Sequence, residues 1–339
     1  MLYKKKLLFL VALFFLMVPA LDAKNSYRNS IQEAQKSYQA QKYELALEQY
    51  RMALDLSPNG WNDASCMAMI GNSLAALKRY DEALKWFELI GELPDINQNT
   101  RVRRFDYAGD LYFYRLKDYP KALENYQTCL EQTSDFRHWA ALQEKMARVF
   151  LAMKKRQEAV HYFKSAILCQ DPYYYAAASA RRQLAGLLLG ERKYDDVIEL
   201  LREVDLTKYR QHERNAAAGY GGIAAFRKKN YELALKFLTA IEQNTNIKLL
   251  YSGQSYLALD QHDKAITALT ALRNNKRFAH RERGEAGMYI GDSYRKQKKF
   301  DDAAKAYKKA IAVTSDANLQ KLLQDRINAL KVTIKKNKK

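Results

Sequence analysis

The stretch from Ala286 to Val313, AGMYIGDSYRKQKKFDDAAKAYKKAIAV, contains the pattern that decides the fold. Small and large apolar residues recur in each half of it at steps of three and four, which places them on one face of a helix. They are Met288, Ile290, Gly291 and Tyr294 in the first half and Phe300, Ala303, Tyr307 and Ala310 in the second. Between the halves lies RKQKK, a polar break of the right length for a tight turn. The stretch therefore predicts two antiparallel helices with small residues where their backbones approach closely.

The same unit recurs eight times along the chain, at intervals of 31 to 39 residues. Its most regular position is the small residue early in the second helix, at Ala46, Ala83, Ala122, Ala159, Val197, Ala234, Ala265 and Ala303. The first helix carries a Gly or Ala for close packing, at Ala34, Gly71, Gly109, Ala147, Ala185, Gly222, Gly253 and Gly291. Gly109 lies one residue out of register, which predicts an extra residue in the turn of the third repeat. A period of this regularity indicates an array of helix pairs.

The spacing small-x2-aromatic-x5-aromatic-x2-Ala-x3-aromatic-x2-Ala resembles the tetratricopeptide repeat, a helix–turn–helix unit of roughly 34 residues. The resemblance covers residues 24–313 and implies an all-α fold, a right-handed superhelical solenoid of about eight repeats. Leucine and isoleucine at helical spacing then predict a capping helix at 314–331, which would cover the exposed face of the last repeat. Residues 332–339 are rich in lysine and are predicted to form a basic tail, either solvated or in contact with an anionic surface.

The first 23 residues have the layout of a secretory signal peptide. A basic start is followed by 12 apolar residues, Leu7 to Val18, and then by small residues that suit cleavage after Ala23 or after Ala20. A spanning helix needs about 20 apolar residues, so a cleaved signal is favoured over a permanent anchor. The sequence thus predicts export to the periplasm, the cell envelope or the extracellular space. The alternative is a protein tethered by an uncleaved N-terminal segment.

The chain is strongly basic, with a formal net charge of +19. Loss of residues 1–23 would leave 54 basic and 37 acidic side chains, a net charge of +17. Such a charge favours acidic protein partners or anionic surfaces. Nucleic acid is not expected as a partner, because no nucleic-acid-binding motif is present. Any membrane contact is expected to be peripheral, and the oligomeric state is left open.

The motifs of catalysis and metal binding are missing from the sequence. The three cysteines are an odd number without a CxxC spacing, and the five histidines show no HxH or HExxH pairing. The one loose dinucleotide motif, GYGGIA at 219–224, falls inside a predicted first helix, where small residues serve packing. We therefore predict a non-enzymatic protein with no catalytic residue, no cofactor and no metal site.

The resemblance also implies where a partner would bind, because the first helices of such repeats line a groove that holds a peptide. The exposed positions of those helices are Tyr38, Asn72, Asp110, Arg148, Arg182, Gln254, Asp292 and Arg295. The three arginines among them suit bidentate pairing with carboxylates. Family members that clamp the C-terminal carboxylate of chaperones use Lys and Asn, and here Asn72 matches but Ile31 and Ala68 replace the lysines.

Two functions remain open from the sequence. The leading hypothesis is a binding scaffold of the cell envelope or secreted space that holds a protein or peptide in the groove, and the basic charge allows this partner to be acidic. The alternative is electrostatic association with an anionic membrane or cell-wall glycan through the basic surface and the lysine-rich tail.

Overall fold

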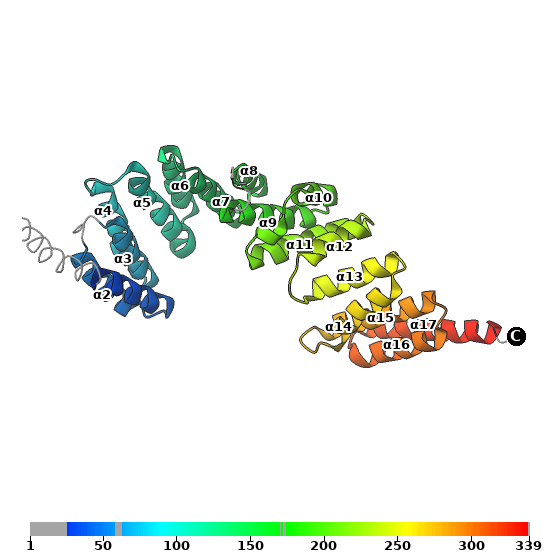
Figure 1. Ribbon diagram of the computed structural model, residues 1–339. Helices are drawn as coiled ribbons and strands as arrows, with labels where there is room; N and C mark the ends of the chain where they lie inside the picture. Colours follow the sequence, from blue (N-terminus) through cyan, green and yellow to red (C-terminus); the bar gives the residue numbers. More distant parts are fainter. Residues whose placement is uncertain (1–25, 58–62, 170, 172–173, 338–339) are drawn as a thin grey trace, which may run out of the picture. The chain divides into compact units, whose positions relative to one another are not determined.

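The computed structural model describes residues 26–57, 63–169, 171 and 174–337, and these residues form helices without any strand (Figure 1). A first helix at residues 26–39 precedes the numbered ones. In unit 1, which comprises residues 1–169, these are α2 (Tyr43–Asp55), α3 (Ala64–Ala76), α4 (Tyr80–Glu92), α5 (Gln98–Leu111), η1 (Tyr112–Leu116), α6 (Tyr119–Gln132), α7 (Phe136–Ala152) and α8 (Arg156–Ile167).

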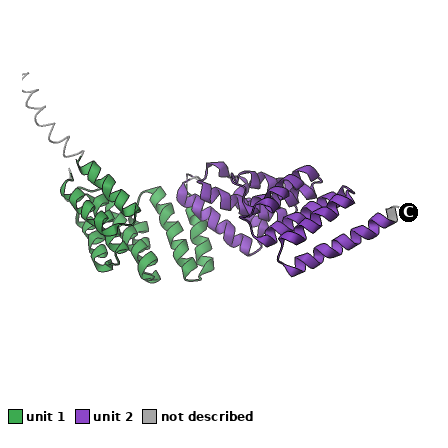
Figure 2. Cartoon of the chain, turned by 90° about the horizontal axis from the view of Figure 1, so that it is seen from below, with its two compact units in different colours: residues 1–169 green, residues 170–339 purple. Residues whose placement is uncertain are grey.

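Unit 2 comprises residues 170–339, and Figure 2 shows the two units in different colours. Its helices are α9 (Tyr175–Gly190), α10 (Tyr194–Arg202), η2 (Leu206–Lys208), α11 (Gln211–Arg227), α12 (Tyr231–Thr239), α13 (Asn246–Ala258), α14 (His262–Asn274), α15 (His280–Lys296), α16 (Phe300–Val313) and α17 (Ala317–Asn337). The described helices thus form eight pairs followed by α17. The fold is an all-α repeat solenoid, as the sequence pattern predicts.

The core of each pair forms around the two small positions of the repeat. The eight second-helix residues from Ala46 to Ala303 have no exposed surface. An aromatic or leucine side chain from the second helix lies across the small residue of the first. A Cβ atom added to Gly71 would lie 2.3 Å from the ring of Phe87, and one added to Gly291 would lie 2.2 Å from the ring of Tyr307. Glycine is required there because the ring occupies the space of a side chain.

The turns inside the pairs share one backbone geometry. In each, a non-glycine residue five positions before the small second-helix residue has a left-handed φ of 56° to 65°; these residues are Gln41, Lys78, Lys117, Lys154, Arg192, Lys229, Asp260 and Lys298. In the last turn the N–H of Lys299 donates to the carbonyl oxygen of Tyr294 at 2.9 Å. This six-residue bond is the Schellman ending of a helix, which normally favours glycine. Helix packing therefore imposes a conformation that the local sequence does not prefer.

The third repeat corrects one prediction. Its extra residue was predicted to lengthen the turn, but the left-handed Lys117 still lies five positions before Ala122. The extra residue is taken up inside the first helix, whose last five residues, Tyr112–Leu116, form a π-helical turn. The N–H of Asp118 accordingly donates to the carbonyl oxygen of Tyr112, one residue further back than in the other turns. A single inserted residue is commonly accommodated in this way.

Helix α17 packs on α15 and α16 through Leu319, Leu323, Ile327 and Leu330, all of which are buried. It runs from Ala317 to Asn337, so it begins later than the predicted capping segment and continues through most of the predicted basic tail. The predicted signal peptide and its cleavage positions lie outside the described residues. No helix among the described residues is long and apolar enough to cross a membrane.

Candidate functional site

Unit 1 contains a hollow of about 410 Å³ on the side formed by its first helices. The helix at 26–39, α3 and α5 with η1 supply most of its wall, and α4 supplies one ring. The lining residues are Tyr38, Asn72, Ala75, Phe87, Tyr107, Asp110, Leu111, Tyr114 and Arg115. Four of these nine are aromatic, which gives the hollow an apolar wall with a few polar groups, as is typical of ligand pockets.

The structure brings together three of the residues that the sequence singled out. Tyr38, Asn72 and Asp110 come from three successive first helices and all line the hollow. A fourth, Arg148, lies at its rim, with its guanidinium group 5.4 Å from the ring centre of Tyr114. These four are therefore parts of one surface in unit 1, and they remain predicted binding residues.

Asp110 belongs to a charged cluster beneath the hollow. Its carboxylate accepts a hydrogen bond from the Tyr126 hydroxyl at 2.6 Å and one from Lys145 Nζ at 2.9 Å. Lys145 Nζ also donates to Asp106 at 2.6 Å, and His138 Nε2 lies 3.2 Å from the other oxygen of Asp106. Lys145 thus connects two carboxylates of α5 to α7, and little of its side chain is exposed.

The two carboxyl groups respond to this cluster in opposite directions. Burial opposes ionisation of Asp106, but Lys145 and His138 outweigh it and lower the pKa of Asp106 to about 2. For Asp110, burial and the nearby charge of Asp106 outweigh Lys145, so its pKa is raised. Burial disfavours the charged form of Lys145, but both carboxylates raise its pKa. The cluster is a buried ion-pair network that fixes α5 against α7.

The same region places a thiol near an imidazole, an arrangement that some hydrolases use. Cys129 Sγ lies 3.9 Å from His138 Nε2, the nitrogen that also faces Asp106. In a catalytic triad the acid lies on the opposite ring nitrogen, where it can orient the base. Burial also raises the pKa of the Cys129 thiol to about 12, so the thiol remains protonated. We interpret this group as structural. The described residues include no cluster of three or more His, Cys, Asp or Glu placed to bind a metal ion.

The predicted residues of unit 2 lie on three different first helices, α9, α13 and α15. Asp292 accepts from the Tyr307 hydroxyl at 2.7 Å and from Arg326 of α17, and Arg295 Nε lies 3.9 Å from it. Arg182 on α9 and Gln254 on α13 are half-buried. The Nε atom of Arg182 is buried without a hydrogen-bond partner.

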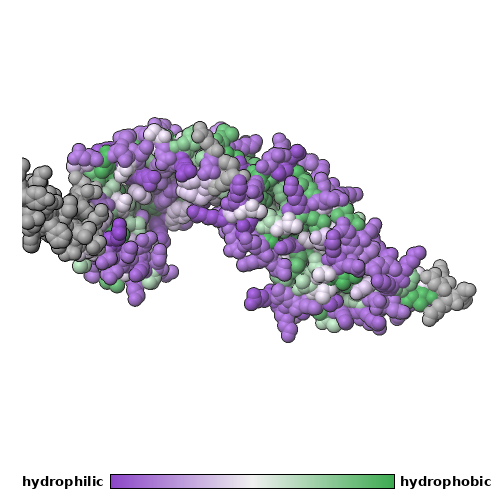
Figure 3. All heavy atoms as spheres, viewed as in Figure 1, coloured by the Kyte–Doolittle hydropathy of each residue, from purple (hydrophilic) through white to green (hydrophobic). Residues whose placement is uncertain are grey.

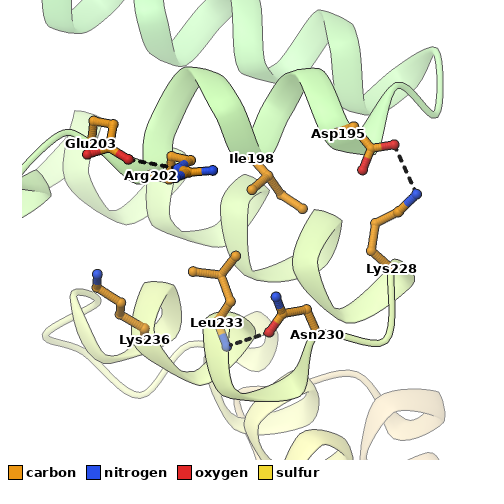
Figure 4. A pocket seen from close by; sticks show the side chains of 8 residues that line it. All are labelled: Asp195, Ile198, Arg202, Glu203, Lys228, Asn230, Leu233 and Lys236. Atoms are coloured by element: carbon orange, nitrogen blue, oxygen red, sulfur yellow. Dashed lines mark hydrogen bonds and ion pairs between the residues drawn. The ribbon is translucent and has the colours of Figure 1, made fainter.

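A larger hollow of about 550 Å³ lies between the second helices α10 and α12 of unit 2 (Figure 4). Its charged side chains largely bind one another. Arg202 Nε contacts Glu203 at 2.7 Å, and Lys228 Nζ contacts Asp195 at 2.9 Å. These residues are mostly exposed, and the apolar part of the wall is limited to Ile198 and Leu233. The hollow of unit 1 is the better candidate because of its aromatic wall.

Comparison with known proteins agrees with the geometry. Residues 64–89 and 252–318 each match a family profile described as tetratricopeptide repeat. The protein is a tetratricopeptide repeat protein. None of the curated proteins matches this sequence.

Solved structures resemble this tetratricopeptide repeat protein in fold. The apo form of RapI aligns over 91% of this chain and 98% of its own, with 14% identity and a TM-score of 0.52. The C-terminal part of a TPR repeat-containing protein from Cytophaga hutchinsonii aligns over 74% of this chain and 96% of its own, with 15% identity and a TM-score of 0.50. Tetratricopeptide repeats typically mediate protein–protein interaction and are generally non-catalytic, which supports a protein-binding scaffold.

Sequence reasoning missed several residues of the hollow in this tetratricopeptide repeat protein. Tyr107 and Tyr114 flank Asp110 at helical spacing, so the period of the helix was a usable signal for them. Arg115 belongs to the π-helical turn at the end of the first helix, whereas the repeat pattern predicted the extra residue in the turn between the helices. Lys145 lies 35 residues from Asp110 in the sequence, so the pattern within one helix or one repeat does not predict their contact.

Proposed function

We propose that unit 1 binds an extended segment of a partner protein across the hollow. Tyr38, Tyr107 and Tyr114 would receive one large apolar or aromatic side chain of that segment. The amide of Asn72, half-buried in the wall, can bond to a peptide backbone. The observation that supports this proposal is the convergence of three successive first helices on one aromatic hollow.

The charges of the rim favour an acidic group next to the inserted side chain. Arg115 is exposed at the wall of the hollow, and Arg148 is partly exposed above Tyr114. Asp110 faces the hollow, but Lys145 and Tyr126 already bind its carboxylate. A carboxylate of the partner would therefore pair with the two arginines, and Asp110 would serve as part of the floor.

We further propose that the protein works as a non-enzymatic scaffold outside the cytoplasm. The basic start, the apolar run and the small residues of segment 1–23 support export. This setting would bring the protein into contact with envelope or secreted partners. Fractionation of native cells, with sequencing of the mature N-terminus, tests it; a cytoplasmic protein that begins at Met1 would contradict it.

Selection from a random peptide display library tests the binding proposal. We expect the wild-type protein to enrich peptides in which an aromatic or large apolar residue neighbours Asp or Glu. Tyr114→Ala should reduce binding of these peptides at least tenfold, since buried aromatic anchors dominate such interfaces. Tyr175→Ala is the matched control, because Tyr175 is a similarly exposed tyrosine of unit 2. Equal binding by Tyr114→Ala and the wild type would refute the proposed site.

A further inference from the structure

The positive charge of the protein is distributed unequally between the two units. Residues 170–339 contain 33 Lys and Arg against 19 Asp and Glu, a net charge of +14. Residues 1–169 contain 24 against 19, a net charge of +5. Figure 3 shows hydrophilic side chains over much of the visible face of the C-terminal helices. Most of the net positive charge of the protein therefore lies in unit 2.

Within unit 2 the turns between first and second helices lie along one edge, and two ion pairs show this. Lys228 in the α11–α12 turn binds Asp195 at the start of α10, at 2.9 Å. Lys296 at the end of α15 binds Asp260 in the α13–α14 turn, at 3.0 Å. Each bond joins the turn of one repeat to that of its neighbour, so successive turns are adjacent.

The end of α17 reaches the same edge. Near the start of α15, a Cβ atom on Gly284 would lie 3.2 Å from Leu319, and further along Asp292 binds Arg326. The partners are 35 and 34 residues apart, so α15 and α17 run parallel in a fixed register. Continuing this register places residues 331–335 of α17 beside the α15–α16 turn at 297–299.

Six cations therefore gather at the C-terminal end of this edge, and we call them the basic edge: Arg295, Lys296, Lys298, Lys299, Lys331 and Lys335. All six are exposed. Acidic groups are also near, but most of them have partners. Asp260 binds Lys296, Asp292 is held by Tyr307 and Arg326, and Asp302 lies 3.5 Å from Lys305, which leaves Asp301 and, at the start of α14, Asp263. The basic edge retains a clear excess of positive charge.

We propose that the basic edge binds the anionic headgroups of a membrane surface. Two observations favour a membrane over an anionic polymer such as a glycan. Asp263, the exposed second residue of α14, interrupts the row of turns and would repel an anionic polymer lying along it. The cations instead come from two segments, and Val332, which follows Lys331 in α17, is 55% exposed. Lysines around an exposed apolar residue at a helix end suit the headgroup region.

The proposal is independent of the peptide site in unit 1. Each basic residue near an anionic surface strengthens binding by about fivefold, which corresponds to about 1 kcal/mol. The other four lysines of the basic edge are not held by Asp260 as Lys296 is, and together they should account for a factor on the order of several hundred; they are Lys298, Lys299, Lys331 and Lys335.

Co-sedimentation of the full chain with vesicles tests the proposal. The vesicles contain phosphatidylcholine alone or phosphatidylcholine with phosphatidylglycerol, at low and at high salt. The test variant replaces the four lysines by glutamine. The matched control carries Lys276→Gln, Arg277→Gln, Lys309→Gln and Lys321→Gln, which remove the same charge from exposed sites elsewhere in unit 2. Both variants keep residues 1–23, so any contribution of that segment cancels. Circular dichroism verifies that both remain helical.

We expect wild type and control to bind the anionic vesicles in a salt-sensitive manner, and the test variant to lose binding by a factor of a hundred or more. Equal losses in both variants would overturn the proposal, because the effect would then depend on net charge alone. No preference of the wild type for anionic over neutral vesicles would overturn it as well. So would salt-sensitive retention on an anionic glycan without binding to vesicles. Peptide binding through Tyr114 should be unchanged in every variant, which separates this test from that of unit 1.

Discussion

The clusters around Asp110 in unit 1 and Asp292 in unit 2 occupy the same position of the repeat. In each, a Gly-Asp pair on the first helix lies beneath a tyrosine of the second helix, whose hydroxyl donates to the aspartate at 2.6 or 2.7 Å. In each, the next helix supplies a cation, Lys145 of α7 or Arg326 of α17. The aspartate therefore has the same packing contacts in both repeats.

The surroundings of the two clusters differ. Three residues before Asp110 stands Tyr107, and Tyr289 takes the equivalent place before Asp292, so this feature is shared. The position of Tyr114, five residues after the small glycine, is taken in unit 2 by Lys296, which is bound to Asp260. Phe87 of the preceding repeat corresponds to Leu269. Unit 1 thus has aromatic walls where unit 2 has an ion pair and a leucine, and only the former suits a peptide side chain.

The largest expected effect comes from removing the cation of each cluster. Lys145→Met should lower the free energy of unfolding by about 3–5 kcal/mol, because it removes the cation that Asp106 and Asp110 share and leaves only His138 beside Asp106. Arg326→Met should cost less, about 1–2 kcal/mol, since that arginine is more exposed and Tyr307 still binds Asp292. Urea unfolding followed by circular dichroism measures both. Equal losses would show that the second carboxylate of unit 1 has no energetic consequence.

Acid should affect unit 1 through Asp106. Its folded-state pKa of about 2 lies below the ordinary value, so its ionised form stabilises the folded state above about pH 4. That contribution, about 2 kcal/mol at most, is lost as the pH falls from 4 to 2. Asp106→Asn should therefore flatten the dependence of stability on pH in this range. Unfolding free energies of both proteins between pH 5 and 2 provide the measurement, and parallel curves would contradict the assignment.

The glycines under the two tyrosines should be equally intolerant of a side chain. A Cβ atom would lie 2.5 Å from the ring of Tyr126 at Gly109 and 2.2 Å from that of Tyr307 at Gly291. We expect Gly109→Ala and Gly291→Ala each to destabilise by about 1–2 kcal/mol, the cost of overpacking less the gain in helix propensity. Gly186→Ala is the control, because its nearest contact is 3.3 Å. Thermal unfolding that ranks the control with the other two would be evidence against this packing.

The smallest effect concerns the turns, which are alike in both units. Lys78→Gly in unit 1 and Lys229→Gly in unit 2 should each stabilise by about 0.5 kcal/mol, because glycine adopts the left-handed φ of these positions without steric cost. Calorimetric melting temperatures should rise slightly for both. A fall in either would mean that the lysine makes a favourable contact that outweighs its backbone strain.

The fold was predictable because small residues recur at the same packing positions in all eight repeats. The residues from Ala46 to Ala303 stand at the buried centre of each pair, as their recurrence indicates. The candidate binding site was only partly predictable. Tyr38, Asn72 and Asp110 follow from the register, but their convergence with Tyr114 and Arg115 depends on the π-helical turn. An inserted residue can be absorbed in a turn or in a helix, and only tertiary packing decides between them.

The buried ion-pair network around Lys145 could not be predicted from the repeat pattern, for a different reason. Lys145 and Tyr126 hold Asp110, a predicted binding residue, in place. That contact joins two repeats, and each repeat examined by itself shows only an aspartate on a helix surface. The same applies to Asp292, whose partner Arg326 comes from α17.

The central claim is that the partner binds over the hollow of unit 1, and site-specific photocrosslinking tests it most directly. A photoreactive phenylalanine analogue is introduced at Tyr114 or at the equivalent position of unit 2, Lys296, and the protein is irradiated in its native cells. We predict a protein crosslink from position 114 that is lost when Arg115 and Arg148 are replaced by alanine, and none of the same partner from position 296. Crosslinks to the partner from position 296 without any from position 114 would contradict the account.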